Sequence, residues 1–171
     1  AVDNAAGMAV GKLLLISQLN DGTIVSTAGA SGTCTWCDGG EGATTGGGGV
    51  AGGRAQGQIV EITSVNGKTI GISPGLYVDY TLMPHATPFV AGKYVGIENL
   101  QVYANNTGYA ANFKMSACAY CWLSGVESNY ADHDHVEMDY GYRDEVVNSY
   151  FSNAFIHDSG NSDADVALRL K

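Results

Sequence analysis

The chain has few charged residues, few prolines and no long apolar run. Only 15% of its 171 residues are charged, with 8 Lys and Arg against 17 Asp and Glu, and there are 3 prolines. Nucleic-acid-binding proteins need clustered Lys and Arg, so the formal net charge of −9 argues against a nucleic-acid partner. No segment approaches the roughly 18 apolar residues of a membrane span, so we expect no membrane partner. Long helical periodicity is absent as well, which leaves strands and loops.

What the chain does contain is glycine, 24 residues of it, together with many strand-favouring Val, Ile, Thr and Tyr. The length predicts one domain spanning residues 1–171, large enough for a hydrophobic core. No basic-then-apolar signal opens the sequence, so any signal peptide was cleaved or never present. The acidic composition, rich in Gly, Asn and Tyr, is typical of an extracellular, secreted bacterial protein.

The N-terminal half, residues 1–93, is predicted to contain strands, a long loop and a hairpin. Residues 12–18 favour a strand, and residues 29–53 are nearly all small and favour a Gly-rich surface loop. Residues 58–65 alternate apolar and polar side chains and lead into Asn66-Gly67, the preferred two-residue turn. We therefore predict a β-hairpin over residues 58–72, followed by an irregular stretch up to residue 93.

The C-terminal half, residues 94–171, repeats itself. Three segments beginning at Asn112, His135 and Asp165 place an apolar residue at their second and fourth positions. A second phrase that begins at Ile97 returns at Leu123 and again at Val147, which makes the copies 26 and then 24 residues apart. Short alternating strands recurring every 20–30 residues predict an all-β solenoid of stacked coils.

The repeated phrases resemble the coil segments of right-handed parallel β-helix proteins of the pectate-lyase-like superfamily. Residues 95–102 (VGIENLQV) and 122–129 (WLSGVESN) are similar to its "I-x-N-L-x-I" and "W-I-x-x-V-x-S" segments, and residues 147–151 (VNSYF) are similar to "V-x-N-S-x-F". The resemblance implies a right-handed parallel β-helix with a strand-rich, Gly-rich N-terminal insertion. Members of this superfamily usually have more coils and a cap at each end. We therefore expect either a fragment of a longer member, or coil ends covered by a partner such as a second copy, giving a homo-oligomer.

The predicted chemistry lies within residues 130–145, where carboxylates and aromatic rings gather. Because Val136 and Met138 belong to the apolar columns, the alternation predicts that Glu137 and Asp139 face solvent. Side chains two residues apart on a strand are separated by roughly 7 Å, within the roughly 6.5–9.5 Å of an inverting glycosidase. The predicted catalytic residues are Asp132, Asp134, Glu137 and Asp139, and the predicted sugar-binding residues are His135, Tyr140, Tyr142, Arg143 and Trp122, with Tyr130 as a further stacking face.

Two alternatives for these polar residues stay open. In the repeat alignment Lys114 lies beside Glu137 and Arg169 beside Asp139, which favours structural charge pairs between coils. Asp132, His133, Asp134 and His135 form the densest group of metal-ligand side chains. They predict either a metal site, with calcium as the candidate cofactor, or a turn whose polar groups cap backbone amides.

The four cysteines form two Cys-x-x-Cys pairs, Cys34/Cys37 and Cys118/Cys121. More than 80 residues separate the pairs, far beyond the spacing typical of a zinc site. An even cysteine count in an exported protein favours disulfides, most simply Cys34–Cys37 and Cys118–Cys121, with zinc binding or free thiols as alternatives.

Two functional hypotheses follow. In the first, the chain is a carbohydrate-active β-helix that acts on or binds an extracellular polysaccharide, as a glycoside hydrolase or polysaccharide lyase. In the second, it is a non-catalytic module that binds glycans or stacks end to end with copies of itself.

Overall fold

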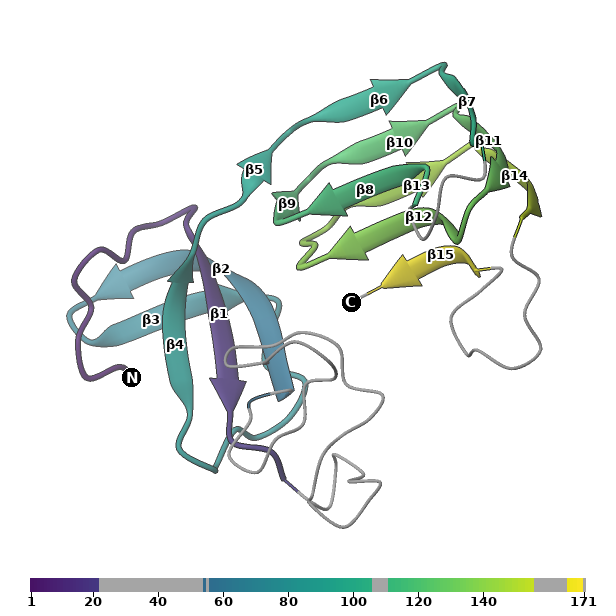
Figure 1. The fold of residues 1–171 in the computed structure, drawn as a ribbon. Coiled ribbons are helices and arrows are strands. Elements are labelled where there is room, and N and C mark those ends of the chain that lie inside the picture. Colours follow the sequence, from purple (N-terminus) through teal and green to yellow (C-terminus); the bar gives the residue numbers. More distant parts are fainter. Residues whose placement is uncertain (22–53, 55, 106–110, 156–165, 171) are drawn as a thin grey trace, which may run out of the picture. The chain divides into compact units, whose positions relative to one another are not determined.

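The computed structural model describes the chain except for residues 22–53, 55, 106–110, 156–165 and 171 (Figure 1). The predicted Gly-rich loop over residues 29–53, with Cys34 and Cys37, therefore lies outside the described residues. The described part is all-β and contains no helix, as the sequence predicted. None of it forms a helix that could cross a membrane. The chain divides into two compact units, residues 1–90 and 91–171.

The first unit is a four-stranded antiparallel sheet with the order β3-β2-β1-β4. Its strands are β1 (Leu13–Gln18), β2 (Gln56–Asn66), β3 (Thr69–Ser73) and β4 (His85–Phe89). The predicted hairpin is confirmed, because β2 pairs with β3 around Asn66 and Thr69, and Gly67 adopts a φ of +58° in the turn. The predicted strand at residues 12–18 corresponds to β1. The irregular stretch predicted up to residue 93 contains β4, an edge strand that tolerates Pro88 because its outer side needs no amide donor.

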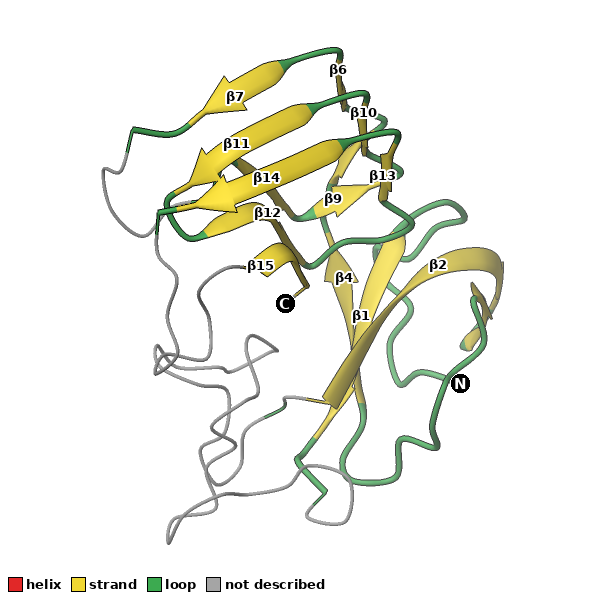
Figure 2. Ribbon diagram, turned by 90° about the vertical axis from the view of Figure 1, so that its right-hand side faces the viewer, coloured by secondary structure: helices red, strands yellow, loops and turns green. Residues whose placement is uncertain are grey.

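The second unit consists of parallel strands arranged in three small sheets, and each sheet takes one strand from each of three successive passes of the chain. The first pass contains β6 (Gly96–Glu98), β7 (Gln101–Tyr103) and β8 (Phe113–Ser116). The second contains β10 (Trp122–Ser124), β11 (Glu127–Ala131) and β12 (Asp134–Asp139). The third contains β13 (Glu145–Val147), β14 (Tyr150–Ala154) and β15 (Val166–Leu170). A shorter pair joins β5 (Gly92–Lys93) to β9 (Cys118–Ala119). Figure 2 shows β7, β11 and β14 side by side.

The second pass pairs with the first in the register that the sequence repeat predicted. Leu123 lies opposite Ile97, so the spacing of 26 residues is confirmed, and Val136 lies opposite Phe113, as the alignment of the Asn112 and His135 segments predicted. The third pass differs from the prediction. Val146, not Val147, lies opposite Leu123, so the second spacing is 23 residues and not 24.

The last strand also takes a different register from the predicted one. Val166 lies opposite Asp134, not Val136, and this displaces the third copy by two residues. Arg169 consequently lies beside Glu137 and not beside Asp139. A shift of two residues leaves every side chain on its own face of the sheet, because strand side chains alternate with a period of two.

The corners between the first and second strands of each pass share one backbone conformation. Asn99, Gly125 and Asn148 lie at equivalent positions and have φ values of +52°, +61° and +52°. Asn and Gly are the residues that adopt this left-handed conformation at low cost. The repeated corner turns the chain from one sheet to the next at the same place in each pass.

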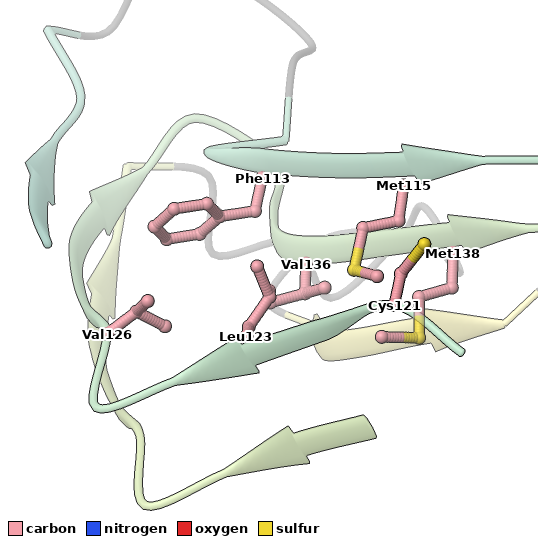
Figure 3. Close-up of a cluster of buried hydrophobic side chains, with 7 residues drawn as sticks. All are labelled: Phe113, Met115, Cys121, Leu123, Val126, Val136 and Met138. Carbon is pink, nitrogen blue, oxygen red and sulfur yellow. The ribbon is translucent and has the colours of Figure 1, made fainter. Parts of the chain in front are cut away.

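The hydrophobic core of the second unit lies between its three sheets (Figure 3). In the middle pass Leu123 of β10 and Val136 and Met138 of β12 point inward, together with Val126 at the corner before β11, and all four are buried. Phe113 and Met115 of β8 complete the core from the first pass. The predicted burial of Val136 and Met138 is confirmed, and it fixes Glu137 and Asp139 on the outer side of β12.

Candidate functional site

The outer side of β8 and β12 carries a small charged group, Lys114, Glu137 and Asp139, which we call the carboxylate cluster. Lys114 Nζ lies 2.6 Å from Glu137 Oε1 and 3.0 Å from Asp139 Oδ2. Hydrogen bonds from the ammonium group to Glu137 and then to Asp139 raise the pKa of Lys114. The predicted alignment of Lys114 with Glu137 is thus realised as an ion pair across neighbouring passes.

The geometry of the carboxylate cluster differs from the predicted glycosidase pair. Because two carboxylate oxygens contact the same nitrogen, they lie within about 6 Å of each other, less than the roughly 6.5–9.5 Å of an inverting pair. The ammonium group of Lys114 also occupies the place between the carboxylates where an inverting enzyme would hold its water. Glu137 and Asp139 are mostly covered rather than open to solvent. The arrangement is that of a structural ion pair.

The segment from Asp132 to His135 is buried, and it does not form part of an open groove. His133 Nδ1 lies 3.0 Å from Asp134 Oδ2. His135 Nδ1 lies 2.7 Å from Ser128 Oγ, which in turn accepts a hydrogen bond of 2.9 Å from Asn112 Nδ2. The Ser128 hydroxyl therefore links Asn112 to the ring of His135. The contacts of His133 and His135 thus lie inside the fold, where most polar groups are hydrogen-bonded.

The described residues contain no group of three or more His, Cys, Asp or Glu side chains placed to hold a metal ion. The metal site predicted at Asp132, His133, Asp134 and His135, with calcium as its candidate ion, therefore has no ligand cluster in this structure. The two histidines instead contact a serine and a carboxylate, and the His135 ring stacks on Phe151 at 5.5 Å.

Cys118 and Cys121 are free thiols, which corrects the predicted Cys118–Cys121 disulfide. Cys118 follows the corner residue Ala117, whereas Cys121 is buried in the core and its amide donates a 2.8 Å hydrogen bond to Asp144 Oδ1. Burial, with a contribution from the neighbouring Cys121 thiol, raises the pKa of Cys118 to about 12. Burial also raises the pKa of Asp144. A thiol with so high a pKa is a poor nucleophile at neutral pH.

The aromatic residues of the predicted site are separated and serve different contacts. Trp122 donates a 2.7 Å hydrogen bond from Nε1 to Glu98, and its ring lies against Gly96, where a Cβ atom would come within 2.0 Å of it. Tyr142 is buried, with the exposed Arg143 guanidinium 5.4 Å from its ring centre. Tyr140 is half-buried at a corner with a φ of +52°.

A different set of rings, which the sequence-based prediction missed apart from Tyr130, lies beside the β7-β11-β14 sheet. Tyr103, Tyr130 and Phe155 come from three successive passes, and we call them the aromatic row. The ring centres of Tyr103 and Tyr130 are 4.9 Å apart, and those of Tyr130 and Phe155 are 5.5 Å apart. Tyr103 is 64% exposed and Phe155 is 36% exposed, whereas Tyr130 between them is half-buried. In the strand register Tyr103 lies opposite Asn129, and Ala154 lies opposite Ala131, so the repeat alone does not place the three rings in one line.

Polar side chains adjoin the aromatic row on the outer side of the same sheet. Asn129 donates a 2.8 Å hydrogen bond from Nδ2 to Glu127 Oε1, and Ser152 donates to Asn129 Oδ1. Tyr150 is paired with Glu127 in register and is largely exposed. Open aromatic faces next to amide, hydroxyl and carboxylate groups are the combination that recognises sugar rings, which are apolar on their faces and carry hydroxyls on their edges.

Comparison with known proteins identifies no relative, since no family model, curated protein sequence or solved structure matches the chain.

Proposed function

We propose that the second unit is a short right-handed parallel β-helix that binds an extracellular polysaccharide through the aromatic row. The fold proposal is supported by three successive passes whose strands pair in parallel in three sheets. The repeated left-handed corner at Asn99, Gly125 and Asn148 supports it further. The acidic composition, rich in Gly, Asn and Tyr, supports an extracellular location.

The observation that carries the binding proposal is the aromatic row itself. Tyr103, Tyr130 and Phe155 form a continuous series of ring contacts across three passes. Ring contact supplies affinity for the apolar faces of sugars, and the neighbouring Glu127 and Asn129 supply hydrogen-bonding groups for hydroxyls. Binding without hydrolysis or elimination fits this geometry better than catalysis. The reason is that both carboxylates of the carboxylate cluster contact Lys114.

Affinity electrophoresis against a panel of neutral and acidic polysaccharides tests the proposal. We expect at least one polysaccharide to retard the protein, and Tyr103→Ala to weaken that binding by about tenfold, or ~1.4 kcal/mol. Tyr94→Ala is the matched control, because Tyr94 is equally exposed but stacks on Tyr120 at a different corner. Equal binding by Tyr103→Ala and the wild type would refute the assignment of the row.

A reducing-sugar assay and an assay for unsaturated products on the same panel test whether the protein is also an enzyme. We expect no turnover. Turnover that disappears in both Glu137→Gln and Asp139→Asn, with the fold retained, would instead restore the hydrolase or lyase interpretation.

A second candidate function, assembly with copies of the same chain, is favoured by a separate observation. Ile97 of the first pass and Leu168 and Leu170 of the third pass are exposed, although each lies opposite a buried residue of the second pass.

A further inference from the structure

The inner columns of the second unit are the sets of inward side chains that lie opposite one another on successive passes. At the first pass two of them end in exposed residues, whereas the columns of β8 end in the buried Phe113 and Met115. Leu123 is 1% exposed, whereas Ile97 at the same place one pass earlier is 38% exposed. Leu100 is exposed in the same way, although its counterpart Val126 is buried. The difference arises because Leu123 has a pass on each side of it, and Ile97 has a pass on one side only.

The third pass ends the columns in the same manner. Val136 is fully buried, whereas Leu168, which lies opposite it on β15, is 40% exposed. Leu170 lies opposite the buried Met138 and is 71% exposed. Both ends of the array therefore present apolar side chains that belong, by their register, to the interior.

The backbone at these ends is also incompletely paired within the described residues. In all three sheets the middle strand has two neighbours, and the strands of the first and third passes have one each. An edge strand offers a row of amide and carbonyl groups to any strand that can align with it. Here three edges lie together at each end, and all of the pairing in these sheets is parallel.

We infer that the occupant of these ends is a second copy of the same chain, stacked head to tail. The second pass already shows what fits, because it pairs in parallel with the first pass on one side and with the third pass on the other. The third-pass end of one copy therefore has the strand directions and inward apolar residues needed to continue the first-pass end of the next copy. This inference rests on the proposed β-helix arrangement.

Head-to-tail contact joins two different surfaces, so it does not close into a dimer by itself. Each added copy presents a new free end, so assembly continues until no free copies remain or another molecule binds the free end. A stack would also repeat the aromatic row from copy to copy and so present several sugar-binding rows to one polysaccharide chain.

Single-end variants of the full chain test this inference, since a charge at one end blocks that end alone. Ile97→Glu should disable the first-pass end and Leu170→Glu the third-pass end. Sedimentation velocity over a range of concentrations should show growing oligomers for the wild type, and each variant alone should stay monomeric at concentrations at least tenfold higher. Val10→Glu, which places the same charge on an exposed valine of the first unit, should assemble like the wild type.

Mixing the two variants gives the sharpest outcome. The intact third-pass end of Ile97→Glu should join the intact first-pass end of Leu170→Glu, which yields dimers and nothing longer. Failure of the mixture to dimerise, with both variants folded by circular dichroism, would overturn the head-to-tail geometry. A wild type that stays monomeric throughout would mean that residues of the same chain cover the ends.

The glycan experiment keeps the two proposals apart. Unchanged polysaccharide binding by a strictly monomeric wild type would remove the stacking and leave the proposed function standing. Stacked oligomers that bind no polysaccharide would support the stacking and refute the proposed polysaccharide binding.

Discussion

Replacing Leu123 by Ala should cost far more stability than replacing Ile97 by Ala, although the two residues lie opposite each other in the same column. Leu123 is enclosed by Phe113, Val136 and Val126, so its loss leaves a cavity between the sheets (Figure 3). Leu→Ala substitutions at such sites cost about 2–5 kcal/mol. Ile97 already contacts water, and we expect its replacement to cost about 1 kcal/mol or less.

Urea unfolding followed by tryptophan fluorescence measures the difference. Trp122 suits this purpose because its indole nitrogen binds Glu98 on the neighbouring pass, so its emission should change when β6 and β10 separate. A Trp36→Phe background removes the other tryptophan. The measurement belongs at low protein concentration, where association cannot bury Ile97.

Equal losses for the two variants would refute the reasoning, because they would mean that the first pass is as well covered as the second. A loss below about 1 kcal/mol for Leu123→Ala would also refute it, since no cavity of the expected size could then have formed.

Three further predictions concern a corner, the carboxylate cluster and a thiol. Gly125→Ala should cost about 1–2 kcal/mol in urea unfolding, because φ is +61° and the new Cβ would lie 2.9 Å from Asn99 Oδ1; an unchanged midpoint would contradict this. Lys114→Met should cost about 1 kcal/mol or less, since the lysine is exposed. Because the folded pKa of Lys114 is raised, its contribution should be complete below the ordinary lysine pKa of about 10.4 and disappear as the pH rises through the folded value; a variant deficit that grew at high pH would contradict this. Cys118, with a pKa of about 12, should resist iodoacetamide in the native protein at pH 8 and react after unfolding, as peptide mass spectrometry would show; equal labelling rates would contradict the raised pKa.

The sequence predicted the pairing of the first two passes and failed at the third for identifiable reasons. Phe113 and Val136 each stand alone as apolar residues between polar neighbours, so only one register places both inside. Val146 and Val147 are adjacent and equally apolar, and either could have been the inward residue. Residues 166, 168 and 170 are all apolar, so a shift of two residues keeps the same alternation, and the pattern cannot distinguish the registers.

The candidate site was predictable only where its residues lie opposite each other on successive passes. Lys114 and Glu137 were aligned by the repeat, and their ion pair followed. Ser128 lies opposite Val102 and Phe151 on the neighbouring passes and faces the interior with them. There it hydrogen-bonds the buried His135. A single sequence does not reveal that polar residues at a corner will bind one another inside the fold rather than face solvent.

The carboxylates and the aromatic rings of this protein differ in what they contact. Glycoside hydrolysis requires two carboxyl groups with space for a sugar, and in retaining or inverting enzymes each group acts directly on the substrate. Glu137 and Asp139 instead share the ammonium group of Lys114, which comes from the preceding pass and links β8 to β12. The aromatic row differs in this respect. The ring of Tyr103 contacts Tyr130, and most of its surface is still exposed to solvent. The charged residues that the sequence brings to attention thus contact one another across passes, and the proposed ligand binding rests on the exposed ring of Tyr103 and its neighbours.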